Sequence, residues 1–231
     1  MPAASATSPR SERAYHHGGL REALVAAAVQ LVEELGPERV TVREAARRAG
    51  VSSGAPFRHF ATRTALMTAV AEAGMLQLSA AIAARLAAMA SDHPLVRLSA
   101  FADAYFDWAV ANATHYRVLA GRALIDFEGS EVLSGRAAAI RAEMTALFDM
   151  AAQRGLLRPG DPAQLHLEAR ALSYGLARMC VDDHLREWGV PPNGAAAAMR
   201  AVMDDFIAGL ARDPKAVREA IAATRASIRR L

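Results

Sequence analysis

Apolar residues recur at helical spacing over most of this 231-residue chain, in segments separated by short breaks. The first segment covers residues 20–35 and stops at Gly36-Pro37, a strong helix terminator. Its stripe places five side chains on one face: Leu20, Leu24, Ala28, Leu31 and Leu35. No stretch alternates apolar and polar residues for long enough to predict a strand. Because alanine, a strong helix former, dominates a composition that is 53% hydrophobic, the sequence predicts an all-α protein.

More segments of helical length follow the first one. We expect helices at residues 41–49, 62–89, 92–111, 131–154, 163–188, 195–212 and, as a terminal amphipathic helix, 213–231. A short helical piece is expected at 114–121, and loops are expected at 126–130, 157–162 and 189–194.

Positive charge is concentrated near the N-terminus. The formal net charge is only +3, yet residues 36–63 contain six arginines and two glutamates. The chain from residue 76 onward is close to neutral. Because a guanidinium group binds phosphate through two hydrogen bonds, this local cluster indicates an anionic partner.

Several features point to a cytoplasmic protein. Cys180 is the only cysteine, so an intrachain disulfide is impossible and a reducing compartment is expected. Residues 1–17 lack the apolar core of a signal peptide, and their Ala, Ser, Pro and Arg content predicts a flexible arm. No run approaches the roughly 20 uncharged apolar residues of a membrane span.

Residues 41–60 have the pattern of a helix, a tight turn and a second helix. Thr41 and Glu44 are spaced as a capping box, which predicts a helix start. Gly50 ends this helix, and Ser52 can cap the next one. This order is typical of a helix-turn-helix.

The second helix, expected from Ser53 to Phe60, has an unusual tip. Gly54, Ala55 and Pro56 are small, so backbone N–H groups at the positive helix end stay uncovered and favour an anion. These three residues are expected to approach DNA bases, an interpretation that requires Ala55 and Pro56 to be exposed. The other residues expected to contact DNA, mostly at phosphates, are Thr41, Arg43, Ser52, Ser53, Phe57, Arg58, His59 and Arg63.

The stretch YHHGGLREALVAAAVQLVEELGPERVTVREAARRAGVSSGAPFRHFATRTALMTAV, residues 15–70, resembles the DNA-binding domain of TetR/AcrR-family transcriptional regulators. The resemblance rests on the GVS turn, the aromatic-x-x-Phe step and the basic residue soon after it. It implies an arm at residues 1–17, a three-helix DNA-binding domain at 18–78 and a helical effector-binding and dimerisation domain at 79–231. Phe57 stands where the family usually has a phosphate-binding Tyr, and Arg63 where it usually has Lys.

The C-terminal part resembles a subgroup with a Trp-x-x-x-His-Gly signature, although only Gly175 of that signature is present. Aromatic residues there are mostly expected in the core, but some should line a cavity, because apolar pockets usually have aromatic walls. Residues 170, 174 and 178 recur on one helical face, where a pocket wall and surface ion pairing are both possible. The residues expected to bind a small-molecule effector are Phe101, Tyr105, Trp108, Phe148, Arg170, Tyr174 and Arg178.

The remaining sequence patterns bear on dimerisation, catalysis and metal binding. An apolar stripe at Met199, Val202, Phe206 and Leu210 fits either a four-helix dimer interface or the core of the chain. No nucleophile and base stand at a catalytic spacing, so an enzyme is not expected, and neither is a cofactor or a metal. His16-His17 is a weak metal pair, because neighbouring side chains point apart and no third ligand is near.

The sequence thus predicts a homodimeric regulator, a repressor, that binds a palindromic DNA operator and responds to an unknown small-molecule effector. The alternative is a helical small-molecule-binding or adaptor protein that does not bind DNA. A steep dependence of DNA binding on salt separates the two.

Overall fold

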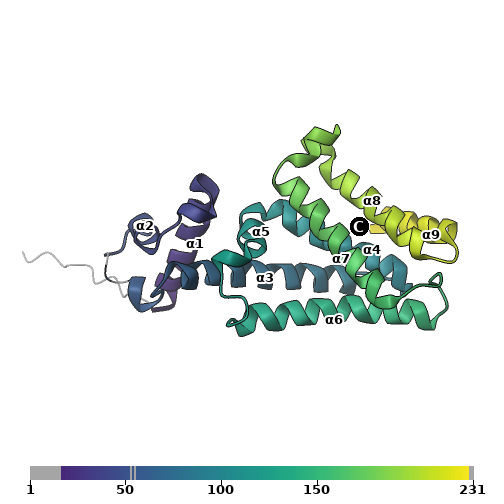
Figure 1. Cartoon of the computed structure of the whole chain (residues 1–231), viewed down its shortest axis with the longest axis horizontal. Coiled ribbons are helices and arrows are strands. Elements are labelled where there is room, and N and C mark those ends of the chain that lie inside the picture. Colours follow the sequence, from purple (N-terminus) through teal and green to yellow (C-terminus); the bar gives the residue numbers. More distant parts are fainter. Residues whose placement is uncertain (1–16, 53, 55, 229–231) are drawn as a thin grey trace, which may run out of the picture. The chain divides into compact units, whose positions relative to one another are not determined.

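The computed structural model describes residues 17–52, 54 and 56–228, and within them it contains helices and no named strand (Figure 1). The predicted all-α class is confirmed. The chain divides into two compact units, residues up to Leu66 and residues from Met67 onward. The division falls within helix α3 (Arg63–Ala87), as does the boundary predicted after residue 78.

The first unit is built on α1 (His17–Leu35), the 3-10 turn η1 (Pro37–Arg39), α2 (Val42–Arg48) and the 3-10 turn η2 (Pro56–Arg58). The predicted stripe of α1 forms its core, with Leu24, Ala28 and Leu31 fully buried. Leu35 is the exception and is 36% exposed, because the helix ends at this residue. Phe60 is buried in the same unit, with the Arg21 guanidinium 5.5 Å from its ring centroid.

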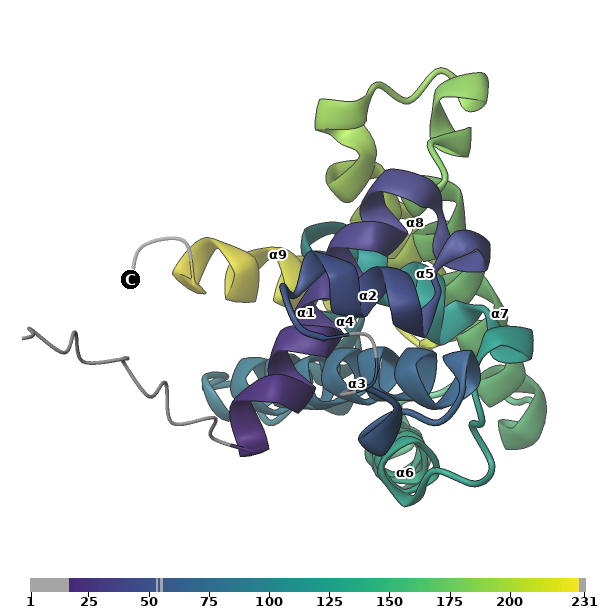
Figure 2. The same ribbon diagram turned by 90° about the vertical axis from the view of Figure 1, so that its left-hand side faces the viewer.

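The second unit surrounds helix α4 (Pro94–Ala111), which packs on the four helices α6 to α9 and is buried along most of its length. Small alanines alternate with large side chains on α4, so several neighbours can approach it closely. The other helices of this unit are α5 (Ala113–Ala120), α6 (Glu131–Gln153), α7 (Pro162–Val181), α8 (Ala195–Leu210) and α9 (Pro214–Ile228). Two 3-10 turns, η4 (His184–Trp188) and η5 (Pro192–Gly194), connect α7 to α8 at the top of Figure 2.

Helix α7 is shorter than the predicted segment 163–188. It ends at Val181, and Asp183 adopts the left-handed conformation with φ of 61°. An aspartate tolerates this conformation better than most residues do, so the helix can stop without a glycine. The chain resumes as the separate turn η4.

Helix α3 is long and apolar enough to cross a membrane by length and composition alone, with a mean hydropathy of 1.4 over 18 residues. The sequence analysis predicted that no run approaches a membrane span, and this prediction must be corrected for helix α3. In the structure, 56% of that window is buried within the protein. A core helix meets the same criterion, so this single helix is weak evidence for a membrane span.

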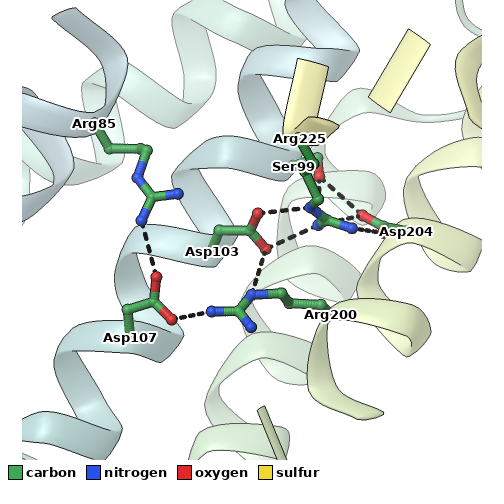
Figure 3. A network of polar contacts seen from close by, with 7 residues as sticks. All are labelled: Arg85, Ser99, Asp103, Asp107, Arg200, Asp204 and Arg225. Carbon is green, nitrogen blue, oxygen red and sulfur yellow. Dashed lines mark hydrogen bonds and ion pairs between the residues drawn. The ribbon is translucent and has the colours of Figure 1, made fainter. Parts of the chain in front are cut away.

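A polar network lies between α3, α4, α8 and α9 (Figure 3). Arg225 of α9 donates hydrogen bonds of 2.9 Å to both carboxylate oxygens of Asp103 and also binds Asp204 and Ser99. Asp103 is only 4% exposed, and burial raises the pKa of its carboxyl although Arg225 acts in the opposite direction. Arg200 forms a further ion pair with Asp103. The network holds the terminal helix α9 on α4 and α8.

Candidate nucleic-acid interface and ligand cavity

Helix α2 begins as the sequence predicts. Thr41 has extended backbone angles, and its hydroxyl accepts a hydrogen bond of 3.1 Å from the backbone N–H of Glu44. The side chain of Glu44 binds Arg47 instead of returning to Thr41, so the reciprocal half of the capping box is not made.

The turn after α2 depends on Gly50. Its φ of 68° lies in the left-handed region, and the N–H groups of Gly50 and Val51 bind the carbonyl oxygens of Arg47 and Ala46. These two bonds close the helix in the manner of a C-terminal cap. A residue with a side chain would be strained at this position.

The segment after the turn differs from the predicted helix Ser53–Phe60. Its regular part is the 3-10 turn Pro56–Arg58, and Ser53 and Ala55 lie outside the described residues. Pro56 is buried, whereas exposure was expected. The reason is that η2 packs on α1 and α2, while the Pro56 carbonyl accepts hydrogen bonds from the N–H groups of His59 and Phe60. Pro56 is therefore a packing residue in this structure.

Exposed groups remain on both sides of this buried proline. Ser52, Gly54 and Arg58 are exposed, Phe57 is 42% exposed, and His59 is half-buried. No atom lies within 4 Å of the Cβ position of Gly54, so its backbone is accessible.

The arginines of the first unit fall into two groups. Arg47 is paired with Glu44, and Arg48 binds Glu34 through two hydrogen bonds of 2.6 Å. Arg43 and Arg58, by contrast, are exposed and have no ion-pair partner within the described part of the chain. These two charges are available to an anionic partner, as is the exposed Arg39, whose Nε binds the Leu35 carbonyl oxygen.

Arg63 is engaged inside the unit. Its Nε donates to the carbonyl oxygen of Val40 at 2.9 Å, and one Nη donates to that of Pro37 at 2.6 Å. The sequence predicted that Arg63 contacts DNA, and this stays a prediction. The two bonds to backbone carbonyls give the guanidinium a structural role in addition.

The second unit contains a cavity of about 1260 Å³. Six of the seven residues expected to bind an effector line it: Phe101, Tyr105, Trp108, Phe148, Arg170 and Tyr174. The seventh, Arg178, is not part of the lining and forms an ion pair with Asp182. The cavity opens to solvent along α7, where Leu167 and Tyr174 of its lining are 68% and 36% exposed.

Two cationic groups of the cavity lie over aromatic rings. The guanidinium carbon of Arg122 is 3.2 Å from the ring centroid of Phe127, and that of Arg170 is 5.1 Å from the ring centroid of Tyr174. Arg122 was not predicted, because it follows a short helix far from Arg170 in sequence and only the fold brings the two together.

Tyr116 lies between Tyr174 and Trp108 in the cavity lining and contacts both of them. The hydroxyl of Tyr116 donates a hydrogen bond of 3.2 Å to the backbone carbonyl of Tyr174, and burial raises the pKa of Tyr116 well above its ordinary value. The rings of Tyr116 and Trp108 are 6.5 Å apart. Trp108 is 5% exposed, and its Nε1–H has no acceptor within the described residues.

The residues of the predicted apolar stripe on α8 lie partly in the core and partly at the cavity or the surface. Met199 and Leu210 are buried inside the chain, and Phe206 lines the cavity. Val202 is 43% exposed, and the nearby turn η4 exposes 75% of Trp188. The stripe as a whole is therefore not a surface for a partner, although Val202 and Trp188 remain available.

Metal binding has no support among the described residues, which contain no group of three or more His, Cys, Asp or Glu able to hold an ion. The suggested pair His16-His17 cannot be placed, since His16 lies outside the described residues and the side chain of His17 is not described.

Two family profiles match this sequence. Residues 24–70 match "Bacterial regulatory proteins, tetR family", and residues 98–206 match "Tetracyclin repressor-like, C-terminal domain". The chain belongs to the TetR family. The members of this family are transcription regulators and not enzymes. The first profile covers α2, its turn and η2, which identifies that segment as the family's helix-turn-helix despite the burial of Pro56.

Relatives and solved structures agree with this assignment. The regulator BetI of Stenotrophomonas maltophilia (strain R551-3) is 36% identical over 98 residues, which are 42% of this chain and 50% of BetI. The chain thus spans about half the length of the curated relatives it matches. A Rhodococcus sp. RHA1 protein of unknown function is 31% identical, with a TM-score of 0.69 over 87% of this chain and all of that one. The TetR-family regulator PfmR of Thermus thermophilus has the same fold, with 20% identity and a TM-score of 0.64 over 82% of this chain and 99% of PfmR.

Proposed function

We propose that this protein is a homodimeric, cytoplasmic repressor that binds a palindromic DNA operator and is released from it by a small-molecule effector. The observation that carries the proposal is that Arg43 of α2 and Arg58 of η2 are both exposed and have no ion-pair partner among the described residues. Phosphate contacts of this kind position a protein on DNA without reading its sequence.

Base recognition is assigned to the exposed residues around the turn. The backbone of Gly54 and the side chains of Ser52, Phe57 and His59 are accessible. In a dimer, two such segments enter major grooves of one palindrome about 34–36 Å apart or at a longer multiple of the helical repeat.

The dimer contact is assigned to α8 and to the segment that joins it to α7. Val202 and Trp188 expose apolar surface there that a second copy can cover. The cavity of the second unit is the effector site in this proposal. An effector that favours a different separation of the two DNA-binding units lowers DNA affinity, by a coupling free energy of about 1–3 kcal/mol.

Selection of bound sites from a random oligonucleotide pool tests the function directly. We expect a single palindromic sequence to be enriched, and half-sites to be bound more weakly. An adaptor protein, the alternative raised by the sequence, would enrich no sequence and would bind random duplex without a steep salt response. Either of these two results would contradict the proposal.

A further inference from the structure

The cavity of the second unit is lined by a long stretch of helix α6. Its lining on α6 runs from Ser134 to Phe148 through residues three or four positions apart, which form one helical face. At 1.5 Å per residue this face extends about 21 Å. The volume of about 1260 Å³ also exceeds the roughly 300–1,000 Å³ typical of small-molecule pockets. These dimensions suit an extended ligand.

The face that α6 contributes is mainly apolar beyond its first turn. Ala137, Ile140, Met144 and Phe148 of α6 line the cavity, with Arg141 and Thr145 as the polar members of this stretch, and Met203 and Ile207 of α8 also belong to the lining. Such a wall favours a hydrocarbon chain, since burial of apolar surface provides about 25 cal/mol per Å².

The cavity lining contains three arginines, Arg122, Arg141 and Arg170, and two carboxylates, Asp126 and Glu128. Arg141 is exposed on α6, whereas Arg122 and Arg170 lie over aromatic rings of the lining and make no ion pair with a carboxylate in the described part of the chain. The Asp126 carboxylate accepts a hydrogen bond from the Gly129 backbone. Two guanidinium groups that face one cavity in this way provide donors for an anionic head group.

The electrostatics of Arg122 supports this assignment. Burial lowers the pKa of its guanidinium, and the neighbouring charge of Arg170 acts in the same direction while Glu128 opposes it. The two arginines are thus near enough to repel each other. An anion between them removes this repulsion.

We propose that the cavity binds an elongated amphipathic anion, with its acidic head group at Arg122 and Arg170 and its hydrocarbon chain along the apolar face of α6. This assignment rests on the proposed function only in naming the ligand as the effector. The binding chemistry itself requires no DNA.

The test compares three probes with the same twelve-carbon chain, dodecanoate, dodecanol and dodecylamine, each titrated calorimetrically into the full chain below its aggregation limit. We expect dodecanoate to bind about tenfold more tightly than dodecanol, and dodecylamine to bind most weakly. Arg122→Gln and Arg170→Gln should each reduce dodecanoate affinity about tenfold and leave dodecanol unchanged. Arg178→Gln is the matched control, because Arg178 lies on the same helix as Arg170 but outside the lining.

The proposal is overturned if dodecanol binds as tightly as dodecanoate, if no probe binds, or if Arg178→Gln weakens dodecanoate as much as Arg170→Gln. Binding of duplex DNA is measured on the same samples without probe. This second measurement distinguishes a failure of the ligand proposal from a failure of the proposed function. A protein that binds operator but none of the probes refutes the ligand class alone. A protein that binds dodecanoate but no duplex refutes the regulator and leaves the ligand class standing.

Discussion

The Arg63 guanidinium donates a hydrogen bond of 2.9 Å from its Nε to the backbone carbonyl of Val40, 23 residues earlier in the chain. With the second bond to Pro37, it joins the start of α3 to the segment between α1 and α2. A positive charge in the first turn of a helix is unfavourable, because it lies at the positive end of the helix dipole. The two hydrogen bonds to carbonyl oxygens offset this unfavourable interaction.

Replacing Arg63 should therefore affect stability as well as DNA binding. We expect Arg63→Ala to lower the free energy of unfolding by about 1–3 kcal/mol, because two carbonyls lose a charged donor. Arg63→Lys should recover part of this loss, since one ammonium group cannot reproduce both bonds of the fork. Urea unfolding followed by circular dichroism measures the difference. An unchanged midpoint for Arg63→Ala would show that the two bonds are not made in solution.

Helices α3 and α5 approach each other at Gly74. A Cβ at this position would lie 2.9 Å from the Cβ of His115, and Gly74 is buried. We expect Gly74→Ala to destabilise the protein by about 1–3 kcal/mol, because the two helices must move apart. Gly135→Ala is the matched control, since Gly135 is exposed in α6 with no atom within 4 Å. It should stabilise by about 0.4–1 kcal/mol, and thermal unfolding of both variants checks the opposite signs.

The network around Asp103 should make Arg225 important for stability. Arg225→Ala leaves the buried Asp103 carboxylate and Asp204 with fewer donors, and we expect a loss of about 1–3 kcal/mol in unfolding free energy. Arg218→Ala on the same helix removes only an exposed pair with Asp205 and should cost about 0–1 kcal/mol. Equal effects of the two substitutions in chemical unfolding would argue against a structural role of the network.

His115 should make stability depend on pH. Burial lowers the pKa of His115 in the folded protein below its model-peptide value of 6.5, so the unfolded chain binds the proton more readily. The stabilising contribution is present above pH 6.5 and is lost as the pH falls through the lower folded-state pKa. We expect His115→Gln to reduce the fall in melting temperature between pH 7 and pH 5. An identical fall in both proteins would exclude this histidine as its source.

Local sequence signals were sufficient for much of the fold. The cap at Thr41, the turn at Gly50 and the buried stripe of α1 depend on residues within a few positions of one another, and all three are present. The break at Asp183 was missed, because neither glycine nor proline marks it.

The site residues were harder to place because their contacts are distant in sequence. Pro56 was expected at the surface, but α1 and α2 cover η2. The partners of Arg63 are 23 and 26 residues away, and no local pattern announces them. The helical spacing of Arg170 and Tyr174 did indicate a shared face, and both line the cavity. Arg122 could not be added to them, since it lies on a different element.

The central claim is that Arg43 and Arg58 contact DNA phosphates. The most direct test is the affinity for a duplex carrying the selected operator, measured by fluorescence anisotropy over a series of salt concentrations. Each of Arg43→Ala and Arg58→Ala should weaken binding and reduce the slope of log K against log salt by about 0.9. Arg218→Ala removes the same charge from the second unit and should leave the slope unchanged. A parent protein whose affinity does not vary with salt, or variants whose slopes equal the parent's, would contradict the account.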